Sequence, residues 1–456
     1  MIPDLEITGA TLDAMIFYTA ILGLLIYIGT LLRLKIGILG KLFIPASLIA
    51  GAIGLILGPY GLSIIPQPMM GFWSALPGRL IVLVFAPMLM GSAMPKLKHF
   101  GNLVGPQVAF SYMSTFVQYA VPLLIGVAIF NPLWNVNNLF GTIVEQGWAG
   151  GHGSAGGMST IFNELNYADG GSLSVTSATI GLLVGILGGM VAINLAVRKG
   201  WTTVLKTTTS LKTGGKGIIS KDEQTPGSMV TINKDIIEPF AFHASLISLA
   251  ILIGWFLTKG LNQYFNISIG LFVTSMLGGL LVQSVISKTK WSAGVDKGTF
   301  QRIQGLALEF LVASAVASIK IPVVIKYALP LIIQQTVMLV VMFWMLFWLC
   351  RRMFPENWFE HGIVLFGAFT GVVAIGLMLL RTVDPEMKTN VGQVFAARSP
   401  FTGPLVGGGA LTALTPSLVV KYGALSVGLT YLGGFVILFF AMRFFGWWYP
   451  VNREMS

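Results

Sequence analysis

Residues 145–157 read EQGWAGGHGSAGG, with glycines at positions 147, 150, 151, 153, 156 and 157. Glycine adopts backbone conformations that other residues avoid, and its missing side chain lets a ligand approach the main chain closely. An irregular stretch at membrane depth is tolerated only where protein buries it or where it lines a cavity, because hydrocarbon offers no hydrogen-bond partner. If the flanking apolar stretches cross a membrane, we therefore expect a broken, re-entrant segment over about residues 139–165.

The composition places the flanking stretches in a membrane. Of the 456 residues, 55% are hydrophobic and only 10% are charged, whereas roughly 25% are charged in a typical soluble domain. The mean hydropathy is +0.81, and the 55 glycines allow helices to pack closely in lipid. These values exclude a water-soluble fold and predict an all-α polytopic membrane protein.

The charged residues and the cysteine exclude several other classes of function. The formal net charge of +11 does not indicate nucleic-acid binding, because Lys and Arg stand in short loops between apolar stretches. The single cysteine, Cys350, excludes an intramolecular disulfide, and no Cys/His cluster has metal-ligand spacing. The first ten residues carry two acids and no Lys or Arg, unlike a cleaved signal, so we expect the first span to be retained.

Eleven stretches approach the roughly 20 apolar residues that a spanning helix needs. A second broken segment is predicted over about residues 361–395, which are apolar but interrupted by glycines and polar groups. The predicted spans are Leu12–Leu32, Phe43–Gly58, Leu80–Met94, Val104–Ile129, Leu173–Val197, Phe240–Thr258, Ser268–Ser287, Ile303–Ile319, Tyr327–Cys350, Phe401–Val420 and Ala424–Phe445.

A polar segment over residues 198–239 divides the spans into two halves of the same order. We predict a first repeat over residues 1–197, a cytoplasmic linker over 198–239, a second repeat over 240–423, and an extra helix with the tail over 424–456. Because each repeat has five spans, an odd number, the second enters the membrane from the opposite side, which makes the repeats inverted. Gln118 and Gln335 occupy matching positions in the two halves, and so do Ser154 and Thr370.

The distribution of Lys and Arg predicts the orientation. With the N-terminus outside, 20 of the 28 Lys and Arg residues lie on the cytoplasmic side and five lie outside. The other three, Arg381, Lys388 and Arg398, lie in or just after the second broken segment. Because short cytoplasmic loops carry an excess of positive charge, we expect the large basic loop and the C-terminus to be cytoplasmic.

Broken segments supply two kinds of ligand-binding group. Half-helix N-termini direct partly positive N–H groups toward a cavity, and unwound carbonyls coordinate a cation. The combination suits a carboxylate and Na⁺ together. The candidate substrate-binding residues are Gly150, Gly151, His152, Gly153, Ser154, Thr370, Gly371 and Arg381, and the candidate sodium-binding or coupling residues are Gln118, Glu145, Glu309 and Gln335.

Several candidates also have a purely structural interpretation. His152 either contacts the substrate or carries a proton, or it packs between glycine turns and donates a hydrogen bond to a carbonyl. Glu309 either serves the ion site, as ionisable groups at membrane depth do, or lies near a helix end in solvent. Gln118 and Gln335 either contribute to the site or join helices through hydrogen bonds.

Arg381 follows an apolar run and precedes Asp384 and Glu386. In one interpretation it forms an ion pair with these carboxylates at the cytoplasmic end of the second broken segment. In the other, its planar guanidinium clamps a substrate carboxylate in a bidentate geometry that Lys cannot reproduce.

The stretch Gly150-Gly-His-Gly-Ser154, followed by the amphipathic run Met158–Leu165, resembles the first re-entrant loop of the bacterial sodium/glutamate symporter family. The resemblance covers roughly residues 40–420. Supporting matches are FIPASLIAGAIGL after the first basic loop, LVFAPMLMGSAMPKLKHFGN around the third span, the glutamines at 118 and 335, and LALEFLVASAVASIKI at the eighth span.

The resemblance implies ten spans in two inverted five-helix repeats, a re-entrant loop in each half, and glutamate transport driven by Na⁺. It also implies a homodimer in which one part of each subunit moves past a fixed scaffold. The chain departs from the family pattern in its second loop, where Phe366-Gly-Ala-Phe-Thr-Gly371 and GLMLLRTVDPEMKT replace the usual Gly-rich, Thr-Pro-containing form. It also has an eleventh helix. The first departure leaves the identity of the solute open.

We therefore predict a symporter of the cytoplasmic membrane that couples Na⁺ to glutamate or a similar acidic solute, without an organic cofactor or a nucleic-acid partner. The alternative in the same class is a carrier for another organic anion, such as a hydroxy-dicarboxylate or tricarboxylate. An intramembrane enzyme that uses His152 and Glu145 on a lipid is disfavoured, because it would need no second inverted cavity and usually shows a tighter acid/base pair. A channel is disfavoured by the lack of a repeated filter sequence.

Overall fold

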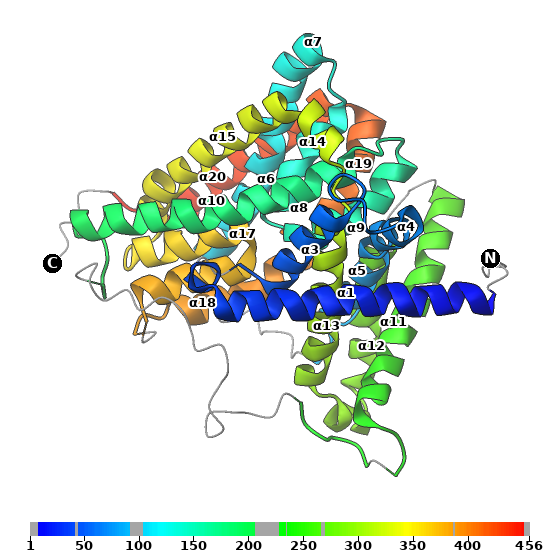
Figure 1. Ribbon diagram of the computed structural model, residues 1–456. Coiled ribbons are helices and arrows are strands. Elements are labelled where there is room, and N and C mark those ends of the chain that lie inside the picture. Colours follow the sequence, from blue (N-terminus) through cyan, green and yellow to red (C-terminus); the bar gives the residue numbers. More distant parts are fainter. Residues whose placement is uncertain are drawn as a thin grey trace. The chain divides into compact units, whose positions relative to one another are not determined.

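The computed structural model describes residues 8–41, 44–91, 104–205, 228–233, 235–265, 270–385 and 388–450 (Figure 1). Within these ranges the regular structure is helical, without β-strands. By length and composition, eight helical segments of the described residues are candidate membrane spans. The prediction of an all-α polytopic membrane protein is therefore confirmed.

The chain forms two compact units, and each unit takes residues from both predicted repeats. Unit 1 comprises Met1–Ala93, Gly156–Glu164 and Gly214–Ile321, and unit 2 comprises Met94–Ala155, Leu165–Thr213 and Pro322–Ser456. The compact units therefore divide the chain differently from the predicted sequence repeats. One boundary between the units falls inside helix α9 (Gly151–Glu164).

Unit 1 packs its helices through small residues. A Cβ at Gly51 in α3 would lie 2.5 Å from Val316 in α13, and one at Gly54 would lie 2.8 Å from Ala317. Only glycine permits such close approach of two helices. The helices of this unit are α1 (Gly9–Lys35), α2 (Gly37–Lys41), α3 (Ala46–Leu57), α4 (Gln67–Ala75), α5 (Pro77–Phe85), α11 (Pro239–Phe265), α12 (Leu271–Ile286) and α13 (Lys297–Ala317), with the short 3₁₀ helix η6 (Lys290–Gly294).

Unit 2 contains the second predicted broken segment and most of the first, whose residues 156–164 belong to unit 1. Helix α6 packs against α17, α18 and α20, while α10 packs against α8 and α17 (Figure 1). Its helices are α6 (Val104–Ile125), η2 (Gly126–Phe130), α7 (Asn131–Trp134), η3 (Asn138–Thr142), α8 (Ile143–Trp148), α10 (Gly170–Lys199), α15 (Ala328–Trp344), η7 (Met345–Leu349), α16 (Cys350–Met353), α17 (Trp358–Val383), α18 (Val391–Thr402), α19 (Ala410–Tyr422) and α20 (Ala424–Phe444), and α14 (Ile321–Lys326) connects the units.

Two helical runs of unit 2 share an unusual order. In each, a long α-helix continues into a five-residue π-helix and then into one α-helical turn: α6, η2 and α7 in the first half, and α15, η7 and α16 in the second. π-Helical turns are rare and recur at functional sites. The shared order fits the proposal that the two halves are repeats.

Several of the predicted spans are interrupted or shorter in the structure. The expected helix Phe401–Val420 is interrupted, because α18 ends at Thr402 and α19 begins only at Ala410. Residues 407–409 between them are glycines, and two of these have positive φ angles of +67° and +99°. The expected spans in residues 43–58 and 268–287 contain apolar helices of only 12 and 16 residues, α3 and α12.

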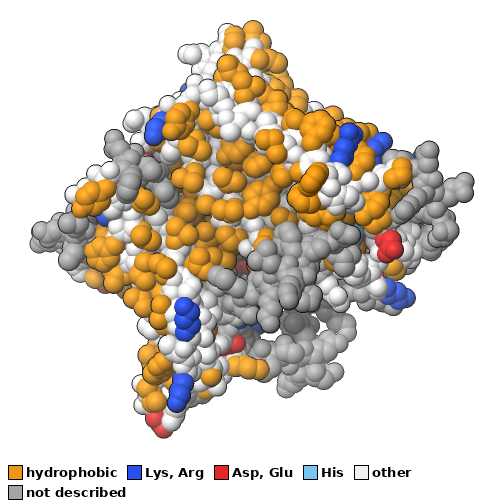
Figure 2. Space-filling model, turned by 180° about the vertical axis from the view of Figure 1, so that it is seen from behind, with side chains coloured by type: hydrophobic (Ala, Val, Ile, Leu, Met, Phe, Trp, Pro, Cys, Tyr) orange, Lys and Arg blue, Asp and Glu red, His pale blue; other side chains and the backbone are white. Residues whose placement is uncertain are grey.

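The surface of the chain is apolar over broad areas, as Figure 2 shows for one face. Large hydrophobic side chains such as Ile437, Phe440 and Phe444 of α20 are 57–86% exposed. In water this exposure would favour aggregation, whereas in lipid it provides the required apolar boundary. The described helices thus have the apolar outer surface that membrane-spanning helices need.

Candidate functional site

The second broken segment is a hairpin of two helices. Gly371 and Val372 leave the helical conformation within α17, and Val372 has φ +67° and ψ 167°. A Cβ added at Gly376 would overlap the carbonyl oxygen of Val364, and one added at Gly367 would lie 2.7 Å from the Cα of Gly376. In a straight helix, residues 364 and 376 would be about 18 Å apart. Residues 358–383 therefore turn back at Gly371 and Val372 and do not form one span.

The first broken segment is interrupted at residues 149–150, between α8 and α9. The next residue, Gly151, has φ +67°, a conformation that suits glycine. A Cβ at Gly151 would overlap Cγ1 of Val372. The interruptions of the two broken segments are therefore in contact with each other within unit 2.

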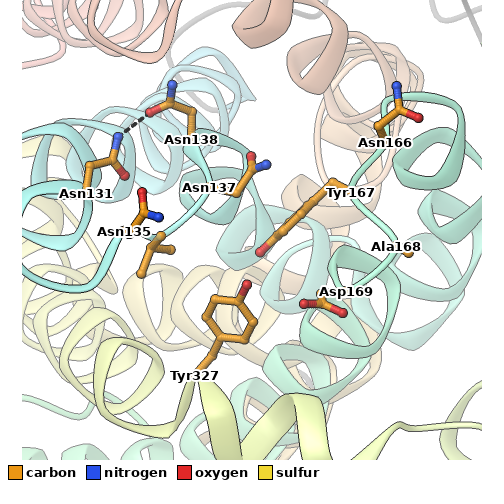
Figure 3. Close-up of a pocket in the computed structure, with 10 residues that line it drawn as sticks. Asn131, Asn135, Asn137, Asn138, Asn166, Tyr167, Ala168, Asp169 and Tyr327 are labelled. Carbon is orange, nitrogen blue, oxygen red and sulfur yellow. Dashed lines mark hydrogen bonds between the residues drawn. The ribbon is translucent and has the colours of Figure 1, made fainter.

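Both ends of the first broken segment line one pocket of about 670 Å³ (Figure 3). Asn131 and Asn138 precede the segment, and Asp169 follows it. The side-chain amide of Asn131 donates a hydrogen bond to Asn138, and the hydroxyls of Tyr167 and Tyr327 point toward the middle of the pocket (Figure 3). Because its two ends share this pocket, the segment returns to the region where it began.

A third interruption lies between α18 and α19. A Cβ at Gly408 would overlap Oγ of Ser154, and one at Gly407 would lie 3.6 Å from the carbonyl oxygen of Ala149. This glycine-rich stretch is followed by Thr415 and Pro416. The second half thus has a Gly-rich, Thr-Pro-containing stretch, and it packs on the first broken segment.

Glu145 joins α6, the first broken segment and the third interruption. Its carboxylate, which is fully buried, accepts hydrogen bonds from the hydroxyl of Tyr119 at 2.6 Å, the backbone N–H of Gly407 at 3.1 Å and the hydroxyl of Thr412 at 2.9 and 3.0 Å. Buried carboxylates are retained where such donors compensate for lost hydration. The donors that surround Glu145 indicate that it positions the glycine-rich stretch.

Gln118 and Gln335 each bind a broken segment close to its interruption. The amide of Gln118 in α6 donates to the carbonyl of Phe369 at 2.6 Å, two residues before Gly371. The amide oxygen of Gln335 in α15 accepts a hydrogen bond from the indole N–H of Trp148 at 2.5 Å. Trp148 directly precedes the first interruption. The predicted pair of glutamines thus occupies corresponding places in unit 2.

The family model for the sodium/glutamate symporter matches residues 11–376. The chain belongs to the sodium/glutamate symporter family. No curated protein matches the chain significantly in sequence. A solved structure titled as the sodium proton antiporter MjNhaP1 from Methanocaldococcus jannaschii aligns with 92% of this chain and 99% of its own at 16% identity and a TM-score of 0.36, a likeness too low to bear on function.

In this member of the symporter family, most of the predicted substrate-binding residues lie at the interruptions. Ser154 and His152 are 3% and 8% exposed, and Gly153 and Gly371 are buried. The Nε2 atom of His152 forms a hydrogen bond with the hydroxyl of Thr179 at 3.0 Å. His152 is thus hydrogen-bonded to a side-chain hydroxyl of α10, whereas the purely structural interpretation had it donate to a carbonyl.

Thr370 lies directly before Gly371 and is fully buried. Its hydroxyl donates to the carbonyl of Phe366 at 2.8 Å. A Cβ at Gly181 of α10 would overlap the carbonyl oxygen of Thr370. This residue therefore belongs to the tight packing of the hairpin tip on α10.

Two predicted site residues lie away from the interruptions. Arg381 is exposed at the end of α17, ten residues and about 15 Å of helix from Gly371. The carboxylate of Asp384 accepts from the backbone N–H groups of Lys388 and Thr389, both at 2.8 Å, and among the described residues it forms no ion pair with Arg381. Glu386, the other expected partner, lies outside the described residues. Glu309 is exposed on α13 in unit 1.

The structure adds Gln107, Ser111 and Ser114, which the sequence did not single out, to Gln118 in a polar row on α6. Gln107, Ser111, Ser114 and Gln118 recur at helical spacing, and all four are fully buried. Arg398 of α18 reaches this row, where its Nη1 donates to the hydroxyl of Ser111 at 2.6 Å. The spacing of the four α6 residues was a signal available in the sequence, whereas nothing local distinguishes Arg398 from the other arginines.

Proposed function

We propose that this chain is a secondary active transporter that couples Na⁺ to the uptake of glutamate or a similar acidic solute. The observation that carries the proposal is the contact between Gly151 and Val372, which brings two interrupted helices together inside unit 2. In transporters, discontinuous helices supply N–H groups for an anion and carbonyls for Na⁺ at such meeting points. Membership of the sodium/glutamate symporter family supports the same solute and ion.

Oxygen atoms near the second interruption suit Na⁺ as the coupling ion. The side-chain oxygens of Ser114, Thr115 and Gln118 are buried and have no hydrogen-bond partner among the described residues. Gln118 also binds the carbonyl of Phe369, which keeps these oxygens close to the tip of the second hairpin. Hard cations prefer such oxygen ligands. We propose that Na⁺ binds beside this turn of α6.

We further propose a cytoplasmic-membrane location with the N-terminus outside, as the distribution of Lys and Arg indicates. In this orientation, the pocket that contains Asn131 and Asp169 opens outward and gives the solute access to the first broken segment. The inverted repeats and the homodimer remain proposals that rest on the order of the spans and on the family resemblance.

The experiment that tests the proposal uses purified protein in liposomes. Vesicles loaded with K⁺ are diluted into Na⁺, and uptake of labelled glutamate, aspartate, malate and citrate is compared. We expect glutamate or aspartate to accumulate only with an inward Na⁺ gradient. Equal uptake in choline buffer would contradict Na⁺ coupling, and preference for malate or citrate would select the organic-anion carrier instead.

A further inference from the structure

Arg398 is the one buried Lys or Arg side chain in the described part of the chain. It is 4% exposed, and its guanidinium lies 4.1 Å from the ring centroid of Phe395 and 5.5 Å from that of Phe369. Nη1 donates to the hydroxyl of Ser111, while Nε is buried without an acceptor among the described residues. The positive charge therefore has aromatic and hydroxyl neighbours but no counter-ion there.

A buried guanidinium without an anion is unfavourable. Removing the charge from water costs free energy that ring contacts and one neutral hydrogen bond offset only in part. Ionisable groups in the interior of membrane proteins accordingly pair with one another or mark a substrate pathway. Among the described residues no carboxylate forms an ion pair with Arg398, and a bound anionic solute would supply the negative charge.

The position of Arg398 is suited to a ligand at the interruptions. Phe369, which lies under the guanidinium, precedes Gly371 by two residues at the tip of the second hairpin. Arg398 itself precedes the third interruption, which begins after Thr402. Because Nη1 is bound to Ser111, the guanidinium edge that carries Nε is left for a carboxylate, in the planar geometry that arginine offers.

We propose that Arg398 binds the second carboxylate of a dicarboxylate solute, while the first carboxylate meets the N–H groups at the helix interruptions. The inference rests on the proposed function and narrows its substrate class to solutes with two carboxylates. Arg398 lies beyond residue 376, where the match to the family model ends, so the family assignment does not supply this role.

The test compares glutamate with glutamine, which has nearly the same shape but lacks the second carboxylate. Binding to the purified full-length chain in saturating Na⁺ is measured by calorimetry for the wild type, Arg398→Gln, Arg398→Lys and the matched control Arg198→Gln, at an exposed arginine in the last turn of α10. We expect Arg398→Gln to weaken glutamate binding at least about tenfold while glutamine binding changes little, because a charge-assisted hydrogen bond is lost only with glutamate. Arg198→Gln should preserve both affinities within about threefold, since exposed charges contribute little.

Other results of these binding measurements would contradict the proposal or one part of it. An equal loss for glutamate and glutamine would assign Arg398 a structural role and overturn it, as would unchanged preference in Arg398→Gln. If that variant does not fold, Arg398→Lys keeps the charge but loses the planar guanidinium, so glutamate binding should weaken more than glutamine binding, and equal weakening of the two would contradict the proposal. A wild type that binds malate in place of glutamate, with the same dependence on Arg398, would refute the glutamate assignment alone. A wild type that binds no dicarboxylate would refute both.

Discussion

Gly151 and Val372 are in contact, although 220 residues of sequence separate them. Both have φ +67°, so both interruptions are held in a backbone conformation that L side chains rarely adopt. A strained residue persists only where the surrounding structure enforces it, and such residues cluster at functional sites. The contact therefore identifies the centre of the candidate site better than either glycine-rich stretch alone.

Replacing Gly151 by Val should abolish Na⁺-driven uptake while the protein still inserts. The new side chain would overlap Val372 and would have to adopt a positive φ. The matched control is Gly433→Val in α20, where an added Cβ meets nothing within 4 Å. Liposome uptake and the elution profile of the purified variants are the measurements. Normal transport by Gly151→Val would remove the first interruption from the site. Gly153→Val tests the neighbouring glycine in the same assay.

Replacing Val372 by Gly should lower the rate of transport without lowering the stability of the protein. Glycine adopts φ +67° and ψ 167° freely, which removes strain on the order of 1–3 kcal/mol. We expect Tm to stay the same or rise, whereas uptake should fall because the contact with Gly151 is lost. A variant that transports at the wild-type rate would show that the contact is not required.

Glu145→Gln should destabilise unit 2. The amide cannot accept all the hydrogen bonds that the carboxylate receives from Tyr119, Gly407 and Thr412. Leaving one buried donor unsatisfied costs about 1–3 kcal/mol, so Tm should fall by several degrees. The control is Glu164→Gln, whose side chain is exposed. An unchanged Tm together with lost Na⁺ dependence would instead support the predicted coupling role of Glu145.

Arg381→Lys should change the glutamate concentration that gives half-maximal uptake by less than about threefold. The side chain is exposed at the end of α17, where exposed ion pairs contribute under about 1 kcal/mol. A bidentate clamp on the substrate would lose about 1.5–3 kcal/mol, roughly ten- to a hundredfold in affinity. Uptake measured at constant expression and Na⁺ distinguishes the two, and a tenfold shift would restore Arg381 to the site.

The predicted orientation can be tested by cysteine labelling. The only native cysteine, Cys350, is fully buried, which gives a low background. A cysteine at Lys216, which lies outside the described residues, should react only with reagents that enter the cytoplasm. A cysteine at the exposed Lys421 should react with an impermeant reagent on intact cells. The reverse pattern would overturn the orientation.

The sequence by itself determined the class of protein, the family and the first broken segment. Hydropathy and glycine density are local properties, so residues 145–157 predicted an interruption, and the structure has it at residues 149–150. The match of Gln118 with Gln335 also followed from position along the chain. The structure gives each glutamine a hydrogen bond next to an interruption.

Only the tertiary structure decided which charged side chains reach the interruptions. Arg381 and Arg398 each follow apolar residues in the sequence, yet one is exposed and the other is buried. The difference arises because Arg398 meets Ser111, which is 287 residues away, on a helix that packs against α18. Local patterns do not encode such a contact, since it depends on how α6, α17 and α18 pack together. For the same reason, the contact of Gly407 and Gly408 with the first broken segment became apparent only in the fold.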